Sequence, residues 1–329
     1  MDYDWGGVLD DEAFIDYWSP RVAKVLARQR ITQLHIRGWK AADLEPLTAF
    51  RDQIEKIDWE VSDENDAADL SALGRMRQLK ELYLSGGLEQ VDFSGLKKLT
   101  SLSVSARQPV FGNLRTCGSL RVLSIMNSGL RDLTPLASLK RLRELVIGEA
   151  SLQALTGIGE LSNLRRLALS QVPLGSLNEI AQAGRLQDVY LYMVGRLESI
   201  APLKALPALR TLNLGSCRKV RDLDSIGELR ELESLELHGV VVSPATLGRL
   251  RRLKLLHLQS YGRIPSIAFV RDLKGLERFY LLEGTVVEDG DMSPLLGLPK
   301  LKKILFDTRR NYSHTLEDVQ RRLANRRRK

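Results

Sequence analysis

Two histidines and a glutamate in this sequence have side chains and a spacing that could bind a metal ion. Glu236 and His238 lie two residues apart in LESLELHGV, and His257 takes the place of Glu236 in the later segment LKLLHLQSY. On neighbouring strands about 4.8 Å apart, the three side chains would share one face, where two imidazoles and a carboxylate could converge on a metal ion. Exposed histidines often meet carboxylates without a metal. We therefore expect hydrogen-bonding interface residues and assign no metal and no cofactor.

Both segments are units of one repeat, which must position these side chains. The sequence contains 13 such units, spaced 20 to 25 residues apart. A period of this length is typical of a solenoid, in which each unit is stable only when stacked on its neighbours. The units begin at Ile31, Ile54, Leu79, Leu99, Leu120, Leu142, Leu164, Leu186, Leu209, Leu232, Leu253, Leu276 and Leu301.

Each unit has two halves with different periodicity. In LRELVI (142–147), Leu145 and Ile147 alternate with Glu144 and Val146, which predicts a short strand with one buried face. The second half, such as SIAPLKALPAL (199–209), has apolar residues three apart and an early proline, which favours a 3₁₀ turn or short helix. Stacked units predict an α/β solenoid with a parallel sheet on one side and helical turns on the other.

The unit LRELVIGEASL (142–152) almost matches the leucine-rich repeat signature L-x-x-L-x-L-x-x-N-x-L. Over residues 31–310 the chain resembles the roughly 22-residue class of these repeats found in internalins and in the regulatory subunit type of protein phosphatase 1. The resemblance implies a horseshoe-shaped, protein-binding scaffold whose concave strands hold the ligand.

The chain departs from this class at the asparagine of the signature. None of the 13 units has asparagine there, so we expect water or main-chain groups to satisfy the backbone atoms that the amide normally bonds. The residues at this position are Trp39, Ser62, Gly87, Arg107, Ser128, Ala150, Val172, Val194, Cys217, Val240, Tyr261, Gly284 and Arg309.

The segment before the repeats, residues 1–30, is predicted to be an N-terminal helical cap. Residues 11–30 are expected to form two helical pieces, the second with Ser19 as its N-cap and Pro20 at its first position. Such a cap would shield the open edge of the sheet.

Residues 311–329 are predicted to be a C-terminal cap helix and a basic tail. The helix is expected over residues 315–326, opened by Thr315 and Asp318 as a capping box. Residues 321–329 carry six basic residues and no acidic one, which leaves +2 of the net charge of +8 for residues 1–320.

Several features predict a cytoplasmic protein. No apolar run approaches the roughly 18–20 residues that span a bilayer. The first residues, MDYDWGGVLDDEAF, are acidic, unlike a secretory signal. Cys117 and Cys217 belong to different repeats, too far apart for a disulfide, and free thiols suit a reducing compartment.

The third, fifth and seventh positions of each unit face the hollow of the predicted solenoid. Aromatic residues gather there although the core lies on the other face, and tyrosine is a typical interface anchor. This face carries five basic and seven acidic residues, whereas a nucleic-acid groove should be basic. We predict that the partner contacts Tyr83, Glu144, Arg166, Asp188, Tyr190, Tyr192, Asn213, Glu236, His238, His257, Arg278, Tyr280 and Leu282.

Basic residues recur at the second position of the units, beside the strands. We call this set the flank ribbon, and it could contact an acidic partner or simply cover the sheet edge with its aliphatic stems. It consists of Lys80, Arg121, Arg143, Arg165, Arg210, Lys254 and Lys302.

The sequence contains no Walker loop, G-x-G-x-x-G, G-x-S-x-G or H-E-x-x-H motif. We therefore predict a non-enzymatic intracellular scaffold, monomeric on its own, that grips a folded protein as an inhibitor, an immunity protein or an adaptor. The alternative is a binder of nucleic acid or another acidic surface through the flank ribbon and the tail. No contact with a membrane is expected.

Overall fold

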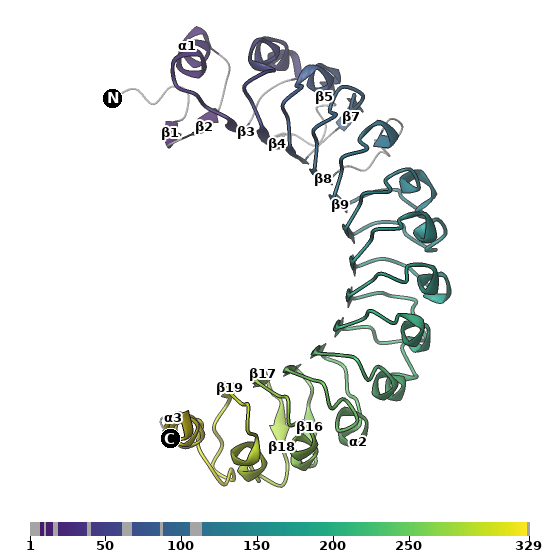
Figure 1. Ribbon diagram of the computed structural model, residues 1–329, viewed down its shortest axis with the longest axis vertical. Coiled ribbons are helices and arrows are strands. Elements are labelled where there is room, and N and C mark those ends of the chain that lie inside the picture. The colour runs from purple at the N-terminus through teal and green to yellow at the C-terminus, as the bar shows by residue number, and fades with distance from the viewer. Residues whose placement is uncertain are drawn as a thin grey trace. The chain divides into compact units, whose positions relative to one another are not determined.

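A computed structural model describes residues 7–9, 11–15, 19–37, 41–60, 68–85, 88–105 and 114–327. The chain divides into two compact units, residues 1–164 and 165–329. Each unit has one mainly parallel sheet, to which each repeat adds one short strand, backed by helical turns (Figure 1).

In the first unit, the sheet begins with an antiparallel pair and continues in parallel. Its strands, in spatial order, are β1 (Gly7–Leu9), β2 (Glu12–Ile15), β3 (Gln33–Arg37), β4 (Lys56–Glu60), β6 (Glu81–Ser85), β8 (Ser101–Ser105), β9 (Val122–Met126) and β10 (Glu144–Gly148). β5 (Ala68–Leu70) and β7 (Leu88–Val91) form a small second sheet. The helical segments are α1 (Pro20–Arg28), η1 (Ala41–Phe50), η2 (Ser71–Arg75), η3 (Leu114–Thr116), η4 (Thr134–Leu136) and η5 (Ile158–Glu160).

In the second unit, all neighbouring strands of the main sheet are parallel. They are β11 (Arg166–Ser170), β12 (Asp188–Tyr192), β13 (Thr211–Gly215), β14 (Ser234–His238), β15 (Leu255–Gln259), β17 (Arg278–Leu282) and β19 (Lys303–Phe306). β16 (Arg263–Ile264) pairs with β18 (Val286–Val287). The helical segments are η6 (Asn178–Gln182), η7 (Ala201–Ala205), η8 (Leu223–Glu228), α2 (Pro244–Leu247), η9 (Ala268–Asp272), η10 (Ser293–Gly297) and α3 (Leu316–Arg327).

The predicted alternation within the strands is confirmed. In β14, Leu235 and Leu237 are fully buried, while Glu236 and His238 lie half-buried on the opposite face. Burying one such leucine contributes about 1.5–3 kcal/mol, so the two apolar rows of each sheet stabilise the stack. The side chains on the other face of the sheet are not needed for this packing.

Main-chain groups are hydrogen-bonded without an asparagine where the chain leaves β12, β13 and β14, as expected. Met193 follows β12 with a φ of 51°, and its amide donates to the carbonyl of Gly215 at 2.9 Å. Ser216 and Gly239 follow β13 and β14 in the same left-handed conformation. The amide of Ser216 donates to the backbone carbonyl of His238 at 2.8 Å, and the amide of Gly239 donates to that of Gln259 at 2.9 Å. The hydrogen-bond ladder between repeats therefore extends one residue past the strands.

Three residues at the asparagine position also use their side chains. The Ser128 hydroxyl accepts from the amide of Leu130 at 3.4 Å. The Cys217 thiol lies 3.3 Å from the carbonyl oxygen of Gly215. The hydroxyl of Tyr261 donates to the carbonyl of Val242 and accepts from its amide at 2.9 Å. Four further residues at this position, Trp39, Ser62, Gly87 and Arg107, lie outside the described residues.

The N-terminal segment differs from the prediction. Residues 12–15 form strand β2 rather than a helix, because Ala13 and Ile15 are buried while the segment pairs in parallel with β3. Four residues are too few for the period-two pattern to stand out in the sequence. The second predicted piece is confirmed as α1, with the Ser19 hydroxyl accepting from the amide of Val22 at 3.3 Å.

The C-terminal helix is confirmed as α3. The amide of Asp318 donates to the Thr315 hydroxyl at 3.1 Å, and the amide of Thr315 donates to the Asp318 carboxylate at 3.4 Å, which is the predicted capping box. Val319 and Leu323 are buried, so most of the basic segment belongs to a packed helix. Both cysteines are free, as predicted, and both are buried.

Replacing Tyr261 with phenylalanine should destabilise the second unit. The change leaves the buried amide and carbonyl of Val242 without their side-chain partner, which costs about 1–3 kcal/mol in the free energy of unfolding. Urea unfolding measures this value. Tyr192→Phe, which changes a half-exposed side chain, should alter it by less than about 0.5 kcal/mol, and equal effects of the two variants would contradict the assignment.

Alkaline pH provides a second test of Tyr261. Burial raises the pKa of its hydroxyl to about 12, whereas an unfolded chain has a tyrosine pKa of about 10. The folded chain thus holds this proton more tightly, so its contribution to stability is complete below pH 10 and disappears as the pH rises to about 12. The unfolding free energy of the wild type should fall more steeply over this interval than that of Tyr261→Phe.

Candidate protein-binding surface

The strand register of the second unit arranges the side chains opposite the core in three rows. The middle row, from β11 to β19, is Ala168, Tyr190, Asn213, Glu236, His257, Tyr280 and Leu305. The row at the carboxyl ends of the strands is Ser170, Tyr192, Gly215, His238, Gln259 and Leu282. The row at their amino ends is Arg166, Asp188, Thr211, Ser234, Leu255, Arg278 and Lys303. The eleven predicted contact residues of this unit therefore lie on one sheet face.

Two tyrosines form an aromatic end of this face on β12. The guanidinium carbon of Arg166 lies 4.5 Å from the centre of the Tyr190 ring, a cation–π contact. Tyr192 is 45% exposed, and its ring lies over Gly215, where a Cβ would approach the ring carbon Cδ2 to 2.6 Å. Met193, the next residue, is 44% exposed. Neither Gly215 nor Met193 is among the contact residues predicted from the sequence.

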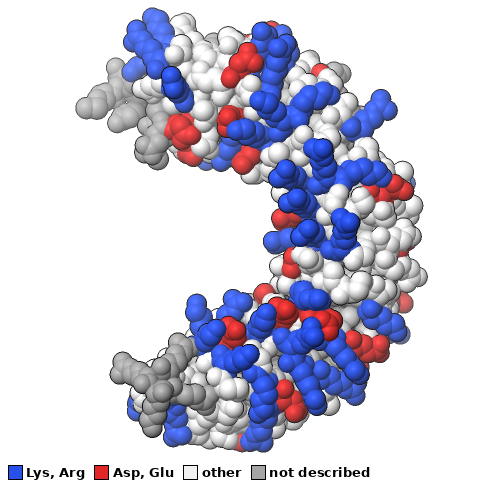
Figure 2. All heavy atoms as spheres, in the orientation of Figure 1, with Lys and Arg blue, Asp and Glu red and all other residues white. Residues whose placement is uncertain are grey.

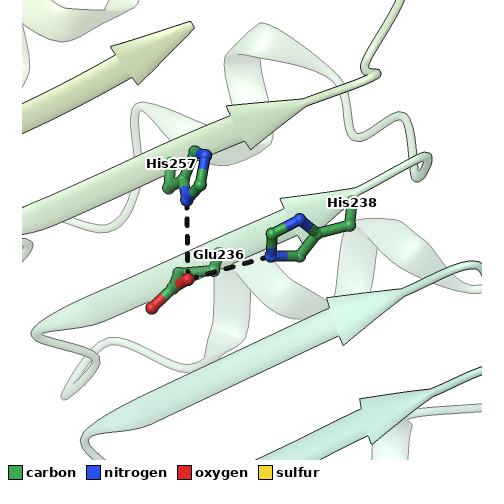
Figure 3. A group of neighbouring side chains, drawn as sticks. All are labelled: Glu236, His238 and His257. Atoms are coloured by element: carbon green, nitrogen blue, oxygen red, sulfur yellow. Dashed lines mark ion pairs between the residues drawn. The ribbon is translucent and has the colours of Figure 1, made fainter. Parts of the chain in front are cut away.

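A polar cluster occupies the centre of the face, on β13, β14 and β15. Figure 3 shows Glu236 between two imidazoles, with its Oε2 atom 3.5 Å from Nδ1 of His257 and 3.8 Å from Nε2 of His238. The Asn213 amide donates to the same carboxylate oxygen and to Nε2 of His238, both at 3.4 Å. The proximity of Glu236 and His257, predicted from the repeat register, is confirmed.

Gln259 orients one imidazole of this cluster. Its Oε1 atom lies 2.8 Å from Nδ1 of His238. Because a carbonyl oxygen can only accept, Nδ1 carries a proton. Nε2 accepts from the Asn213 amide and therefore presents a lone pair on the side of Glu236. Gln259 is not among the predicted contact residues, although the register places it next to His238 in the same row.

The cluster favours the ionised form of its carboxylate. The hydrogen bond from His257 lowers the pKa of Glu236, burial opposes this effect, and the two imidazoles add a further lowering. A half-buried negative charge is therefore held at the centre of the face.

The other end of the face is mostly apolar. The rings of His257 and Tyr280 meet edge to face, with 5.7 Å between their centres. Leu305 is 44% exposed and lines a cavity of about 350 Å³ together with Tyr280 and residues of α3, including Gln320 and Leu323. This cavity gives the face a recess beside its aromatic surface.

The remaining two predicted contact residues lie in the first unit. Tyr83 is on β6, where its hydroxyl lies 3.4 Å from the Glu81 carboxylate and the Lys56 ammonium lies 5.8 Å from its ring centre. Glu144 begins β10. Both occupy the face opposite the core of their own sheet.

Comparison with known proteins identifies the architecture. The structure is similar to an internalin (InlF) from Listeria monocytogenes, with 19% sequence identity, coverage of 84% of this chain and 87% of that one, and a TM-score of 0.50. The chain has the leucine-rich repeat fold. An internalin C2 from Listeria monocytogenes has 21% sequence identity, coverage of 54% of this chain and 77% of that one, and a TM-score of 0.43. A leucine-rich repeat protein from Leptospira interrogans has 16% sequence identity, coverage of 89% of this chain and 93% of that one, and a TM-score of 0.48. No protein-family model and no curated protein matches the sequence.

The flank ribbon of this leucine-rich repeat chain is interrupted by acidic residues. Lys254 pairs with Glu233 at 2.6 Å, and Lys302 pairs with Glu277 at 2.7 Å. In each pair the glutamate holds the same repeat position one unit earlier. Lys80 also pairs with Glu55 of the preceding repeat, whereas Arg210 pairs with Glu231, the last residue of its own unit. Figure 2 shows acidic side chains among the basic ones on the side of the molecule that it presents. These pairs reduce the positive potential that the ribbon alone suggests.

No helix in the described part of the chain combines the length and the apolar character needed to cross a membrane.

Replacing Gly215 with alanine should displace the Tyr192 ring without unfolding the sheet. The added methyl group would occupy space that the ring edge now fills, and a half-exposed ring can rotate away. The aromatic NMR signals of Tyr192 should shift in this variant. Gly195→Ala, where a Cβ meets open space, is the matched control and should leave them unchanged; unchanged signals in Gly215→Ala would contradict the contact.

Proposed function

We propose that this chain is a non-enzymatic scaffold that grips a folded protein with the sheet face of its second unit. The observation that carries the proposal is the placement of Tyr192, which is 45% exposed although Val189 and Leu191 of the same strand are fully buried. The Tyr192 ring therefore contributes little to the hydrophobic core. Exposed aromatic side chains on a rigid strand are typical anchors of protein interfaces.

The composition of the face supports a protein partner over a nucleic acid. An aromatic end, a half-buried polar centre and an apolar end with a recess match the apolar anchors and polar contacts of protein interfaces. Basic residues such as Arg166 and Arg278 share the face with Asp188 and Glu236, so no continuous positive track is present among its described residues.

The role we infer is that of an inhibitor, an immunity protein or an adaptor, because a binding scaffold acts by occupying its partner. We propose a cytoplasmic location and a monomeric free state. The free thiols of Cys117 and Cys217, both buried, suit a reducing compartment.

Removing the two tyrosines of β12 should weaken the complex. Anchors of this kind cost about 2 kcal/mol or more when truncated, so Tyr190→Ala with Tyr192→Ala should raise the dissociation constant at least about 30-fold. The partner is first recovered by cross-linked affinity capture from native lysate, and calorimetric titration then measures both constants.

The flank offers a control for this experiment. Lys254 pairs with Glu233 beside the strands, so Lys254→Ala should leave the dissociation constant nearly unchanged. Normal binding by the double variant, combined with a loss in Lys254→Ala, would show that the partner uses the flank instead.

The nucleic-acid alternative is tested by neutralising charge rather than by truncation. Deleting residues 321–329 would remove Leu323, which is 5% exposed and packs in the C-terminal helix. Replacing Arg326, Arg327, Arg328 and Lys329 with glutamine keeps that contact, and should abolish most non-specific binding to duplex DNA and its dependence on salt.

A set of flank variants matches this charge change. Replacing Arg121, Arg143, Arg165 and Arg210 with glutamine removes the same number of charges from the flank ribbon, and should leave non-specific binding largely intact. The reverse result, with salt-sensitive binding lost only in the flank variant, would favour a nucleic-acid surface on the flank.

A further inference from the structure

The polar centre of the binding face contains a group of possible metal ligands. One carboxylate oxygen of Glu236 and one imidazole nitrogen each of His238 and His257 all lie within 4.8 Å of one another. We propose that Glu236, His238 and His257 bind a divalent transition-metal ion, Zn²⁺, through these three atoms, with water in the fourth position. The proposal concerns the free chain and does not depend on the proposed protein partner.

Two of the three spacings between the ligand atoms are close to those of a zinc site, and all three are within 4.8 Å. Bonds of about 2.0–2.2 Å in a tetrahedron place two ligand atoms about 3.3–3.5 Å apart. The Glu236 oxygen lies 3.5 Å from His257 Nδ1 and 3.8 Å from His238 Nε2. Small rotations of the side chains would close the site, while hydrogen-bonded strands hold the backbone in register.

The protonation of His238 makes one ligand atom available. Its Nδ1–H donates to Gln259 at 2.8 Å, so Nε2 turns a lone pair toward a carboxylate oxygen, which also can only accept. At 3.8 Å no hydrogen bond joins these two atoms. The Asn213 amide donates to both of these atoms at 3.4 Å, and a cation would take the place of that donor between the two acceptors. A ligand imidazole usually donates its other N–H to an outer partner, as His238 does to Gln259.

The second imidazole contributes through Nδ1. This atom donates a hydrogen bond to Glu236, so metal binding requires the ring to carry its proton on Nε2 instead. Nε2 of His257 is buried and has no hydrogen-bond partner among the described residues, so nothing fixes the proton on Nδ1 from that side. Side-chain exposures of 27% for Glu236, 23% for His238 and 16% for His257 leave the site open to an incoming ion but partly shielded from water.

The ligand types determine which ion is favoured. Calcium and magnesium bind oxygen atoms, whereas two imidazoles and one carboxylate suit zinc and related transition metals. This ligand set occurs in tetrahedral zinc sites with three protein ligands and a water in the fourth position.

A second histidine cluster in the chain, around His35, does not direct three ligand atoms toward one point. His35 on β3 contacts Asp58 through Nδ1 at 3.3 Å and Glu12 through Nε2 at 3.6 Å. The two carboxylates lie at opposite nitrogens of one ring, so they cannot share an ion with it. This cluster provides a matched control.

The test uses the full-length, untagged chain, freed of metal by dialysis against a chelator. Zinc chloride is titrated in competition with a chromogenic chelator, and we expect one zinc ion per chain. His238→Ala and His257→Ala should each weaken zinc binding more than about tenfold, and His35→Gln should leave it unchanged. Circular dichroism verifies that each variant is folded.

Gln259→Ala keeps all three ligands and removes only the group that orients His238. Loss of such an outer partner typically weakens metal binding about 10- to 100-fold, and we expect a loss in that range. The proposal is overturned if the wild type binds no zinc, or if zinc binding is unchanged in both His238→Ala and His257→Ala. Equal losses in His35→Gln and the site variants would also overturn it, because they would indicate unspecific binding by surface histidines.

Discussion

A single repeat of this chain cannot bury its own apolar side chains, and the other features of the structure follow from that constraint. In β14, Leu235 and Leu237 are fully buried only because flanking repeats and the helical turns behind the sheet cover them. Alternation within a strand then sends every other side chain to the opposite face. The stack thus fixes the positions of Glu236 and His238, although their side chains do not contribute to the core. Residues on that face can therefore be chosen for function.

The described ends of the later strands, such as β12 and β13, show how the stack is stable without an asparagine at this position. A left-handed residue such as Met193 or Ser216 costs about 1–3 kcal/mol in backbone strain. In return its amide reaches the carbonyl of the neighbouring repeat, at 2.9 and 2.8 Å in these two cases. Because backbone atoms make this bond, the side chain at the next position can vary, and residues as different as Val194 and Tyr261 occupy it.

The repeat sequence predicts the strands, their register and the approach of Glu236 to His257, because these depend on periods of two and about 22 residues. It does not reveal Gly215, whose importance comes from a ring on the neighbouring strand that needs the space of a Cβ. Strand β2 was also missed, since four residues carry too little periodic signal. Contacts across strands depend on side-chain rotamers, which no spacing in the sequence encodes.

The polar cluster shows why a sheet surface can hold reactive groups in order. Its members come from three strands whose backbones are fixed by the ladder, so few side-chain torsions separate the observed arrangement from a closed metal site. Asn213 and Gln259 reduce that freedom further, because one donates to Nε2 of His238 and the other accepts from Nδ1. The rigid sheet therefore supplies in advance much of the ordering that a metal ion or a partner protein would otherwise impose on binding.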